Sequence, residues 1–274
     1  MGAPANDIPS YPTLNEIAQD EALDALDPLR HLRNDDHDTF GGTHGELEAD
    51  PVVPAQPRSI FDQTLHLSFS DTTQQNDHEI TIALKVDASP GCGGIAWPAG
   101  EVLANYLALR GRQYIAGKTI LELGSGTGLV GLVAGVLEGK VWITDQAPLL
   151  DIMRCNVKIN QLQSSVSVSE LNWGDPLPSD LPMPDLILAA DCVYFEPAFP
   201  LLVQTLSDLA TETTDILFCF KKRRKADKRF FALLKKKFSW TEIKDDPNRD
   251  VYSREAISLL MLSKRHLGTG PVHN

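Results

Sequence analysis

The sequence contains no apolar run close to the roughly 20 residues that a helix needs to cross a bilayer. Its first residues lack the charged and apolar regions of a secretory signal. The four cysteines, Cys92, Cys155, Cys192 and Cys219, have neither C-x-x-C spacing nor histidines nearby, and no two histidines are four residues apart. These absences argue against a membrane protein, a disulfide framework and a metal site. They predict a cytoplasmic protein with reduced thiols and no metal.

Basic charge is scarce in the first part of the chain. Residues 1–60 hold 12 acidic and 3 basic side chains, whereas the rest of the chain holds 25 acidic and 22 basic ones. The net charge of −12 therefore belongs mainly to an acidic, proline-rich segment, residues 1–58, which we expect to be largely disordered. The remainder is nearly neutral, so we expect no direct nucleic-acid binding by a domain at 59–265, which a short tail at 266–274 follows.

The hydrophobic pattern changes twice along the domain. Alternating apolar residues over 59–87 predict an antiparallel hairpin, which with the next loop forms an appendage over 59–96. Strands then alternate with helices over 97–265. We expect strands at 119–123, 141–144, 166–171, 185–190, 215–220, near 240–243 and at 256–262. We expect helices from Pro98 up to Gly111 and at 128–138, 148–159, 198–209 and 226–236. This order predicts an α/β fold with a Rossmann-like, seven-stranded, doubly wound sheet whose last strand is antiparallel.

A glycine-rich turn follows the first core strand. Gly124, Ser125 and Gly126 lie between a buried strand and an apolar helix, where backbone N–H groups can face a nucleotide. The spacing is G-x-G-x-G, and the third glycine of a dinucleotide fingerprint is replaced by Leu129. This variant is common where S-adenosylmethionine binds, because no pyrophosphate is held and Glu122 can face the cationic methionine end. An ordinary tight turn is the alternative.

Polar and aromatic residues follow the next three strands. Asp145 ends the second strand, where a carboxylate can accept hydrogen bonds from ribose hydroxyls, or cap the next helix. Trp173 follows the third strand and can lie against a purine, or pack in the core. Asp191 and Tyr194 follow the fourth, where they can attract and enclose a cationic amine. Turn capping and rim packing are the alternatives for this last pair.

Five motifs occur together in a fixed order. They are Trp97-Pro98, the segment Glu122-Leu-Gly-Ser-Gly-Thr-Gly-Leu129, Thr144-Asp145, Leu171-Asn-Trp-Gly174 and Ala190-Asp-Cys-Val-Tyr194. In these motifs the chain resembles the seven-β-strand protein-lysine methyltransferases with an Asp-x-x-Tyr motif, also called methyltransferase family sixteen. The resemblance covers about residues 59–265. Within the family it extends to the fungal elongation factor methyltransferase 6 type.

The resemblance implies an enzyme that transfers a methyl group from S-adenosyl-L-methionine to a lysine of translation elongation factor 1-alpha. It implies a monomer in which Asp191 and Tyr194 hold the target lysine. It also implies a cofactor pocket formed by Trp97, Glu122, Gly124, Ser125, Gly126, Asp145, Trp173 and Ala190. One position departs from the family, because Asn172 stands where an aspartate is common.

Other functions remain open at this point. A methyltransferase for RNA or a small molecule is disfavoured, because the segment from Asp191 to Tyr194 lacks the Pro-Pro of the loop that methylates bases or glutamine. A non-catalytic binding module with the cofactor fold and an NAD oxidoreductase are further alternatives. The basic run 221–237 holds 10 bases and one acid, and it is either a solvated helix face or a patch beside the substrate opening.

Overall fold

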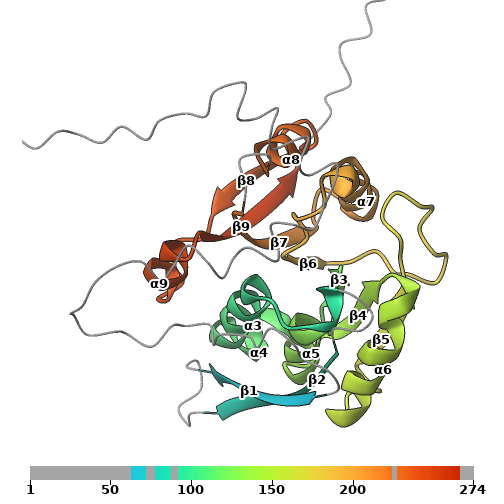
Figure 1. The fold of residues 1–274 in the computed structure, drawn as a ribbon, viewed down its shortest axis with the longest axis vertical. Helices are drawn as coiled ribbons and strands as arrows, with labels where there is room; N and C mark the ends of the chain where they lie inside the picture. The colour runs from blue at the N-terminus through green and yellow to red at the C-terminus, as the bar shows by residue number, and fades with distance from the viewer. Residues whose placement is uncertain (1–62, 72–77, 88–91, 224–226, 266–274) are drawn as a thin grey trace, which may run out of the picture.

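Seven strands form the central sheet of the computed structural model, in the order β5-β4-β3-β6-β7-β9-β8 (Figure 1). The structure describes residues 63–71, 78–87, 92–223 and 227–265. The expected acidic segment 1–58 and tail 266–274 lie outside these residues. The strands are β3 (Thr119–Leu123), β4 (Lys140–Asp145), β5 (Val166–Glu170), β6 (Leu186–Ala190), β7 (Asp215–Lys221), β8 (Phe238–Glu242) and β9 (Ile257–Lys264).

The direction of the strands confirms the expected Rossmann-like sheet. β5, β4, β3, β6 and β7 are mutually parallel, and β9 pairs antiparallel with both β7 and β8. The central strand β6 consists entirely of apolar residues, as expected for a strand covered on both faces. Its neighbour β3 is also buried, so the two strands form a rigid base for the loops that follow them.

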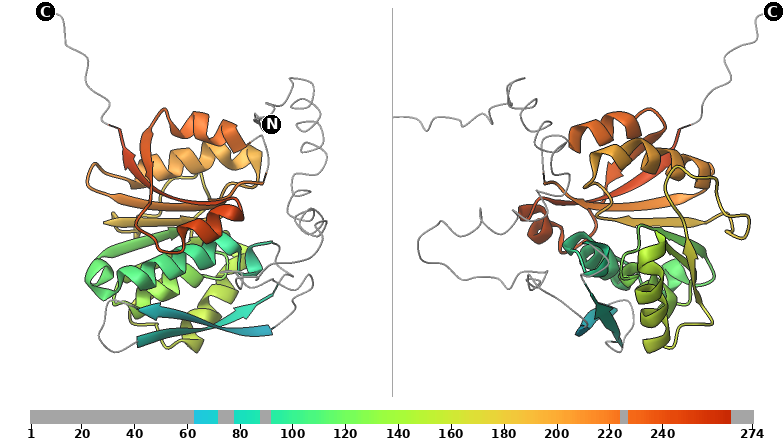
Figure 2. Two further views of the ribbon diagram at one scale, coloured as in Figure 1. Left: turned by 90° about the vertical axis from the view of Figure 1, so that its left-hand side faces the viewer. Right: turned by 45° about the vertical axis from the view of Figure 1, so that its right-hand side comes forward.

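Helices cover both faces of this sheet (Figure 2). The helices are α3 (Pro98–Arg110), α4 (Arg112–Ile115), α5 (Leu129–Val136), α6 (Leu150–Ile159), α7 (Phe199–Leu209), α8 (Asp227–Leu234) and α9 (Arg249–Arg254). One apolar core lies between the sheet and α3, α5 and α6, and a second lies between the sheet and α7 and α8. No helix in the described part of the chain is long and apolar enough to span a membrane.

The expected hairpin forms a separate two-stranded sheet from β1 (Gln63–Asp71) and β2 (His78–Val86). It packs on the outer side of α3, α5 and α6, so these helices lie between two sheets. Alternate residues of β2, namely Ile82, Leu84 and Val86, are buried against the helices. This alternation is what the period of two in the sequence predicted.

Most element ends differ from the expectation by one or two residues, and the short helices α4 and α9 were not expected. The helix expected from residue 148 begins at Leu150, because Ala147–Leu149 forms a 3-10 turn that contains Pro148. The connector between β8 and β9 contains the short helix α9, which its polar sequence did not indicate. Tyr252 of α9 is buried, and it anchors this helix to the core. None of these differences changes the order of the strands in the sheet.

Candidate active site at the carboxyl edge of the sheet

A cavity of about 650 Å³ opens where β3, β4 and β6 end. The strand order reverses beside β3, and open α/β sheets bind ligands at the carboxyl ends of the strands near such a reversal. The cavity wall contains every site residue that the sequence predicted: Trp97, Glu122, Gly124, Ser125, Gly126, Asp145, Trp173, Ala190, Asp191 and Tyr194. Residues from five separate segments therefore converge on one space.

The glycine-rich turn has a backbone that other residues adopt only under strain. Gly124 and Gly126 have φ values of 59° and 56°. A Cβ atom on Gly126 would lie 2.5 Å from the carbonyl oxygen of Gly93, and one on Gly124 would lie 2.8 Å from the ring of Trp173. The turn is thus closely covered by neighbouring groups, and glycine is required at both positions.

Hydrogen bonds from the next strand hold this turn in place. The hydroxyl of Ser125 accepts the N–H of Thr144 at 2.9 Å and donates to the carbonyl of Glu122 at 3.1 Å. The hydroxyl of Thr144 donates to the same carbonyl at 2.7 Å. All three residues are buried, so these bonds are shielded from water and keep the turn in one conformation.

Glu122 occupies the base of the turn, beneath the start of α5. Its Oε2 accepts the N–H of Gly131 at 2.9 Å, and this N–H is one of the amides that the first turn of a helix leaves unpaired. Burial raises the pKa of this carboxyl from its ordinary value of 4.5 to about 8. At neutral pH the group is therefore mostly uncharged. The expected attraction to a cationic methionine end is weakened, and capping α5 is the role that the contacts support.

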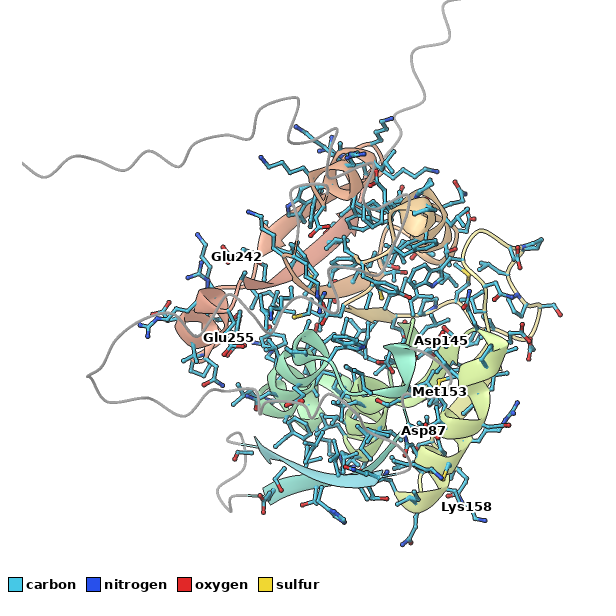
Figure 3. The ribbon with its side chains drawn as sticks, viewed as in Figure 1. Asp87, Asp145, Met153, Lys158, Glu242 and Glu255 are labelled. Carbon is cyan, nitrogen blue, oxygen red and sulfur yellow. The ribbon has the colours of Figure 1, made fainter. Side chains whose placement is uncertain are left out.

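Asp145 ends β4 beside the glycine turn (Figure 3). Its Oδ2 accepts the N–H of Gly126 at 2.8 Å, and its Oδ1 accepts the N–H of Gln146 at 2.7 Å. Burial raises the pKa of this carboxyl, and the two N–H groups oppose the shift. Each oxygen keeps a second lone pair, which is what two vicinal ribose hydroxyls need.

Two tryptophans line the cavity. Trp173 comes from the loop after β5, and the following residue, Gly174, donates its N–H to the hydroxyl of Thr205 at 2.9 Å. Trp97 precedes α3 and lies 5.3 Å from the guanidinium carbon of Arg223. Both are partly exposed to the cavity rather than enclosed in the core, so an aromatic face is available to a planar ligand.

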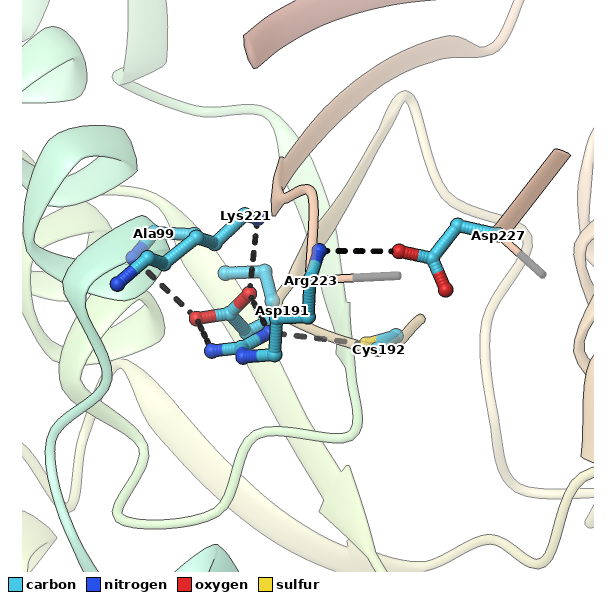
Figure 4. A network of polar contacts seen from close by, with 7 residues as sticks. Ala99, Asp191, Cys192, Lys221, Arg223 and Asp227 are labelled. Carbon is cyan, nitrogen blue, oxygen red and sulfur yellow. Dashed lines mark hydrogen bonds and ion pairs between the residues drawn. The ribbon is translucent and has the colours of Figure 1, made fainter. Parts of the chain in front are cut away.

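Asp191 and Tyr194 come from the loop after β6. Asp191 has a φ of 54°, and its N–H donates to the carbonyl of Cys219 at 2.9 Å. The guanidinium of Arg223 donates to both of its carboxylate oxygens, at 2.8 and 3.1 Å (Figure 4). Tyr194 is half-buried in the same wall. Within the described ranges no group of histidine, cysteine or acidic side chains could hold a metal ion.

Sequence reasoning missed Arg223, which was hidden among similar residues of the basic run 221–237. Its burial follows from contacts with Asp191, Trp97 and Asp227, which come from segments distant in the sequence or from the start of the next helix. Within α8, Phe230 and Leu234 are fully buried, which agrees with the expectation of a helix with one apolar face turned inward. Gly93 was also missed, although the glycines around it suggested a backbone that passes close to another segment.

This arrangement fits S-adenosylmethionine. The glycine turn is closely covered, since an added Cβ would meet Gly93 or Trp173, so its backbone can approach a ligand in the cavity. Asp145 offers acceptors for ribose, and Trp173 offers an aromatic face for a purine. Ala190, the last residue of β6, contributes a small side chain to the wall next to the Asp191 loop.

Comparison with known proteins identifies the family. Residues 74–237 match the family described as lysine methyltransferase. The protein-lysine N-methyltransferase EFM6 of Saccharomyces cerevisiae is 39% identical over 256 residues, which cover 82% of this chain and 98% of that relative. The protein N-lysine methyltransferase METTL21A of Danio rerio is 40% identical over 199 residues, which cover 70% of this chain and 89% of that relative.

The solved structures support the fold. The Thermus thermophilus 16S rRNA N2 G1207 methyltransferase RsmC, in complex with AdoMet and guanosine, superposes with a TM-score of 0.52 at 17% identity. The match covers 77% of this chain and 53% of that chain, and it concerns the fold alone. From the family match and its two relatives, the chain belongs to the lysine methyltransferase family and is an S-adenosylmethionine-dependent protein-lysine N-methyltransferase.

Proposed function

We propose that the protein methylates a lysine of translation elongation factor 1-alpha. The observation that supports this most directly is the match to the yeast EFM6 enzyme over nearly the full length of that relative. The chain also carries the five motifs by which it resembles the protein-lysine methyltransferases with an Asp-x-x-Tyr motif. Substrate choice depends on loops at the rim of the cavity, and a match across the whole domain includes those loops.

The residues of the cavity divide into two groups in this proposal. Gly124, Ser125, Gly126, Asp145 and Trp173 hold the cofactor, together with Trp97, Glu122 and Ala190 in the wall. Asp191 and Tyr194 receive the lysine from the other side. When bound, S-adenosylmethionine supplies a methyl group on a sulfonium, which the lysine nitrogen takes up.

The chain has to present the lysine as a neutral amine. A free lysine has a pKa near 10.4, so deprotonation at pH 7.4 costs about 4 kcal/mol. A partly dry cavity lowers this cost because burial disfavours the ammonium. Asp191 orients the amine, and Tyr194 narrows the space around it with a ring and a hydroxyl. Alignment of the nitrogen is the main contribution, since the cofactor carries its own leaving group.

The proposal also covers the location and state of the protein. We expect a cytoplasmic monomer, because the proposed substrate works in translation and because Cys155, Cys192 and Cys219 are free thiols. Cell fractionation and size-exclusion chromatography with light scattering test these two points. A stable dimer, or a protein confined to another compartment, would contradict them.

The first experiment is incubation with radiolabelled S-adenosylmethionine and a lysate from cells lacking this protein. The label is resolved on a gel after separate nuclease and protease treatments. We expect one protease-sensitive band at the size of elongation factor 1-alpha, which purified elongation factor then reproduces. Nuclease-sensitive label would contradict the proposal by moving the substrate to RNA. A band of another size would keep a protein substrate and exclude this one.

A further inference from the structure

Arg223 and Asp191 form an ion pair inside the cavity wall. Their side chains are only 2% and 3% exposed, and the guanidinium contacts the carboxylate through two parallel hydrogen bonds. The N–H of Lys221 donates to Oδ1 at 3.0 Å and the N–H of Ala99 lies 3.4 Å from Oδ2 (Figure 4). Among the described residues, each carboxylate oxygen of Asp191 thus faces two N–H donors, one from the guanidinium and one from the backbone.

Arg223 connects three segments that are distant in the sequence. Its backbone N–H donates to Asp227 at the start of α8 at 3.1 Å, which fixes the chain just after β7. Its guanidinium lies over the ring of Trp97 at the start of α3 and pairs with Asp191 after β6. Burial of an arginine at this point is costly unless such partners hold it, so the contacts indicate a defined role.

The net charge of the Arg223–Asp191 pair affects the protonation state of a lysine that enters the cavity. An isolated buried carboxylate stabilises an ammonium, which cannot attack a methyl group because its nitrogen has no free electron pair. The guanidinium cancels this effect, because the pair carries no net charge. The other ionisable side chains that line the cavity are Glu122, Asp145, Cys192 and Tyr194, and Lys221 of β7 lies next to the pair. Among the side chains that line the cavity in the described part of the chain, Arg223 carries the positive charge, and it lies directly against Asp191.

We propose that Arg223 is a positioning residue that neutralises Asp191 and holds it in place, so that the cavity receives the target lysine as a free amine. This inference rests on the proposed lysine methylation at the same site. Asp191 then orients the amine because its carboxylate is held in a fixed position, and not because a negative charge attracts an ammonium. The lysine ammonium releases its proton to solvent water before the methyl transfer, and Arg223 itself contacts neither lysine nor methyl group.

Two variants separate charge from hydrogen bonding. Arg223→Gln keeps one donor toward Asp191 and removes the charge, whereas Arg223→Lys keeps the charge and loses the two-pronged contact. Arg154→Gln is the matched control, because Arg154 is an exposed residue of α6 whose side chain is 58% exposed. Affinity for S-adenosylhomocysteine, measured by calorimetry, confirms in each case that the cofactor side of the cavity is intact.

The first readout is the pH dependence of kcat on the substrate that the lysate experiment identifies. Loss of a neighbouring positive charge raises the pKa of the bound lysine by about one unit or more. For Arg223→Gln we expect the rise of kcat with pH to move upward by that amount. At pH 7.5 this means a kcat about tenfold lower and a KM lowered by a similar factor, because the ammonium form, which predominates in solution, then binds more tightly. Arg223→Lys should keep the pH profile of the unchanged protein.

The second readout needs no substrate protein. n-Butylammonium serves as a fragment of the lysine side chain, and its binding at pH 7 in the presence of S-adenosylhomocysteine is followed by fluorescence of Trp97 and Trp173. Arg223→Gln should bind it about tenfold more tightly, because Asp191 is no longer neutralised. The gain should disappear in the double variant Asp191→Asn with Arg223→Gln.

The outcomes separate the inference from the proposed function. A lower kcat with no shift in its pH profile would overturn the inference and leave Arg223 as a structural residue. A higher kcat in Arg223→Gln would also overturn the inference, since the Arg223 side chain would then occupy the lysine position and compete with the substrate. If the lysate shows no labelled protein, the proposed function fails, while n-butylammonium still decides whether Arg223 neutralises Asp191.

Discussion

At the scale of single residues, Asp191 combines two features that sequence alone does not explain. Its φ of 54° lies in the left-handed region, which aspartate and asparagine tolerate better than other residues with a side chain. Its carboxylate is buried with Arg223. A strained backbone held by a buried ion pair is typical of a functional loop, because the surrounding structure has to maintain it.

Asp191→Asn tests the carboxylate without disturbing the backbone. Asparagine accepts the same φ and nearly the same volume, and it keeps one oxygen that can accept from Arg223, although it removes the negative charge opposite the buried guanidinium. We therefore expect a folded protein with a lower Tm that binds S-adenosylhomocysteine within a few-fold of the unchanged affinity. We expect methyl transfer to fall by about 100-fold or more, the scale of losing a positioned polar group at the reacting atoms. An asparagine variant with normal turnover would remove Asp191 from the site.

Asp191→Ala is a poorer test of the same residue. It leaves the guanidinium of Arg223 buried without its partner, and breaking such a pair costs about 3–5 kcal/mol of stability. We expect a clearly lower Tm for the alanine variant than for the asparagine variant. Thermal unfolding of both variants, measured side by side, shows whether a loss of activity comes from chemistry or from folding.

Trp173→Ala tests the aromatic wall of the cofactor side. The ring lies against Gly124, and its loss should weaken S-adenosylhomocysteine binding by roughly 1–2 kcal/mol, the scale of one lost aromatic stack. Calorimetry measures the change. Trp240→Ala is the control, because Trp240 packs on Phe231 at the far edge of the sheet. Equal effects of the two substitutions on affinity would assign Trp173 to the core.

At the scale of elements, hydrogen bonds from side chains of α6 hold the hairpin against the domain. Asn156 and Asn160 lie one helical turn apart, and each side-chain amide pairs with both backbone groups of one β2 residue, Lys85 and Ala83 respectively. These side-chain amides pair with the backbone groups along the outer edge of β2, as a neighbouring strand would. Asn156 also donates to the carbonyl of Thr127 at 2.9 Å, so it connects the hairpin to the cofactor turn.

Asn156→Ala tests this connection. Asn156 is fully buried, and its loss leaves several backbone groups without a partner, so we expect a destabilisation of about 1–3 kcal/mol. Urea denaturation measures it, and faster hydrogen exchange at Lys85 should locate it in β2. The half-buried Asn160 provides the comparison, and Asn160→Ala should cost less. A larger effect of Asn160→Ala would show that the glycine-rich turn does not depend on the hydrogen bonds of Asn156.

At the scale of the whole molecule, buried acids make stability depend on pH. Burial raises the pKa of Glu122 from 4.5 to about 8, so between these values the unfolded chain releases a proton that the native state retains. The stability contributed by this group is therefore greatest at low pH and falls as pH rises through this window. Above about pH 8 both states are ionised, and the loss is complete.

Glu122→Gln removes this titration and keeps an oxygen that can accept the N–H of Gly131. We expect its stability relative to the unchanged protein to increase steadily from pH 5 to pH 8. Urea denaturation at several pH values measures the difference in unfolding free energy between the two proteins. The titration of Asp145 cancels in this difference because both proteins contain Asp145. Glu138→Gln, at an exposed ion pair with Arg112, serves as the control. Parallel stability curves would show that Glu122 titrates normally in the folded state.

The order of the elements could be predicted because it follows from local patterns. The apolar run Leu186–Ala190 had to be a central strand, and Gly111, with its φ of 67°, ends α3 where the sequence indicated. The candidate site followed from one rule of topology, since the ends of parallel strands meet at one edge. Every candidate site residue does line one cavity, while the role of each stays a prediction.

Sequence alone determined the fold class, the cofactor turn and the family, because hydrophobic periodicity, glycine spacing and motif order are properties of neighbouring residues. Only the tertiary structure decided which charges meet. Arg223 lies 32 residues after Asp191 in a run of similar bases, and nothing local distinguishes it from the others. The pairing depends on how β6, β7 and α3 converge, and the cost of burying a charge without a partner selects the one arginine that reaches the carboxylate.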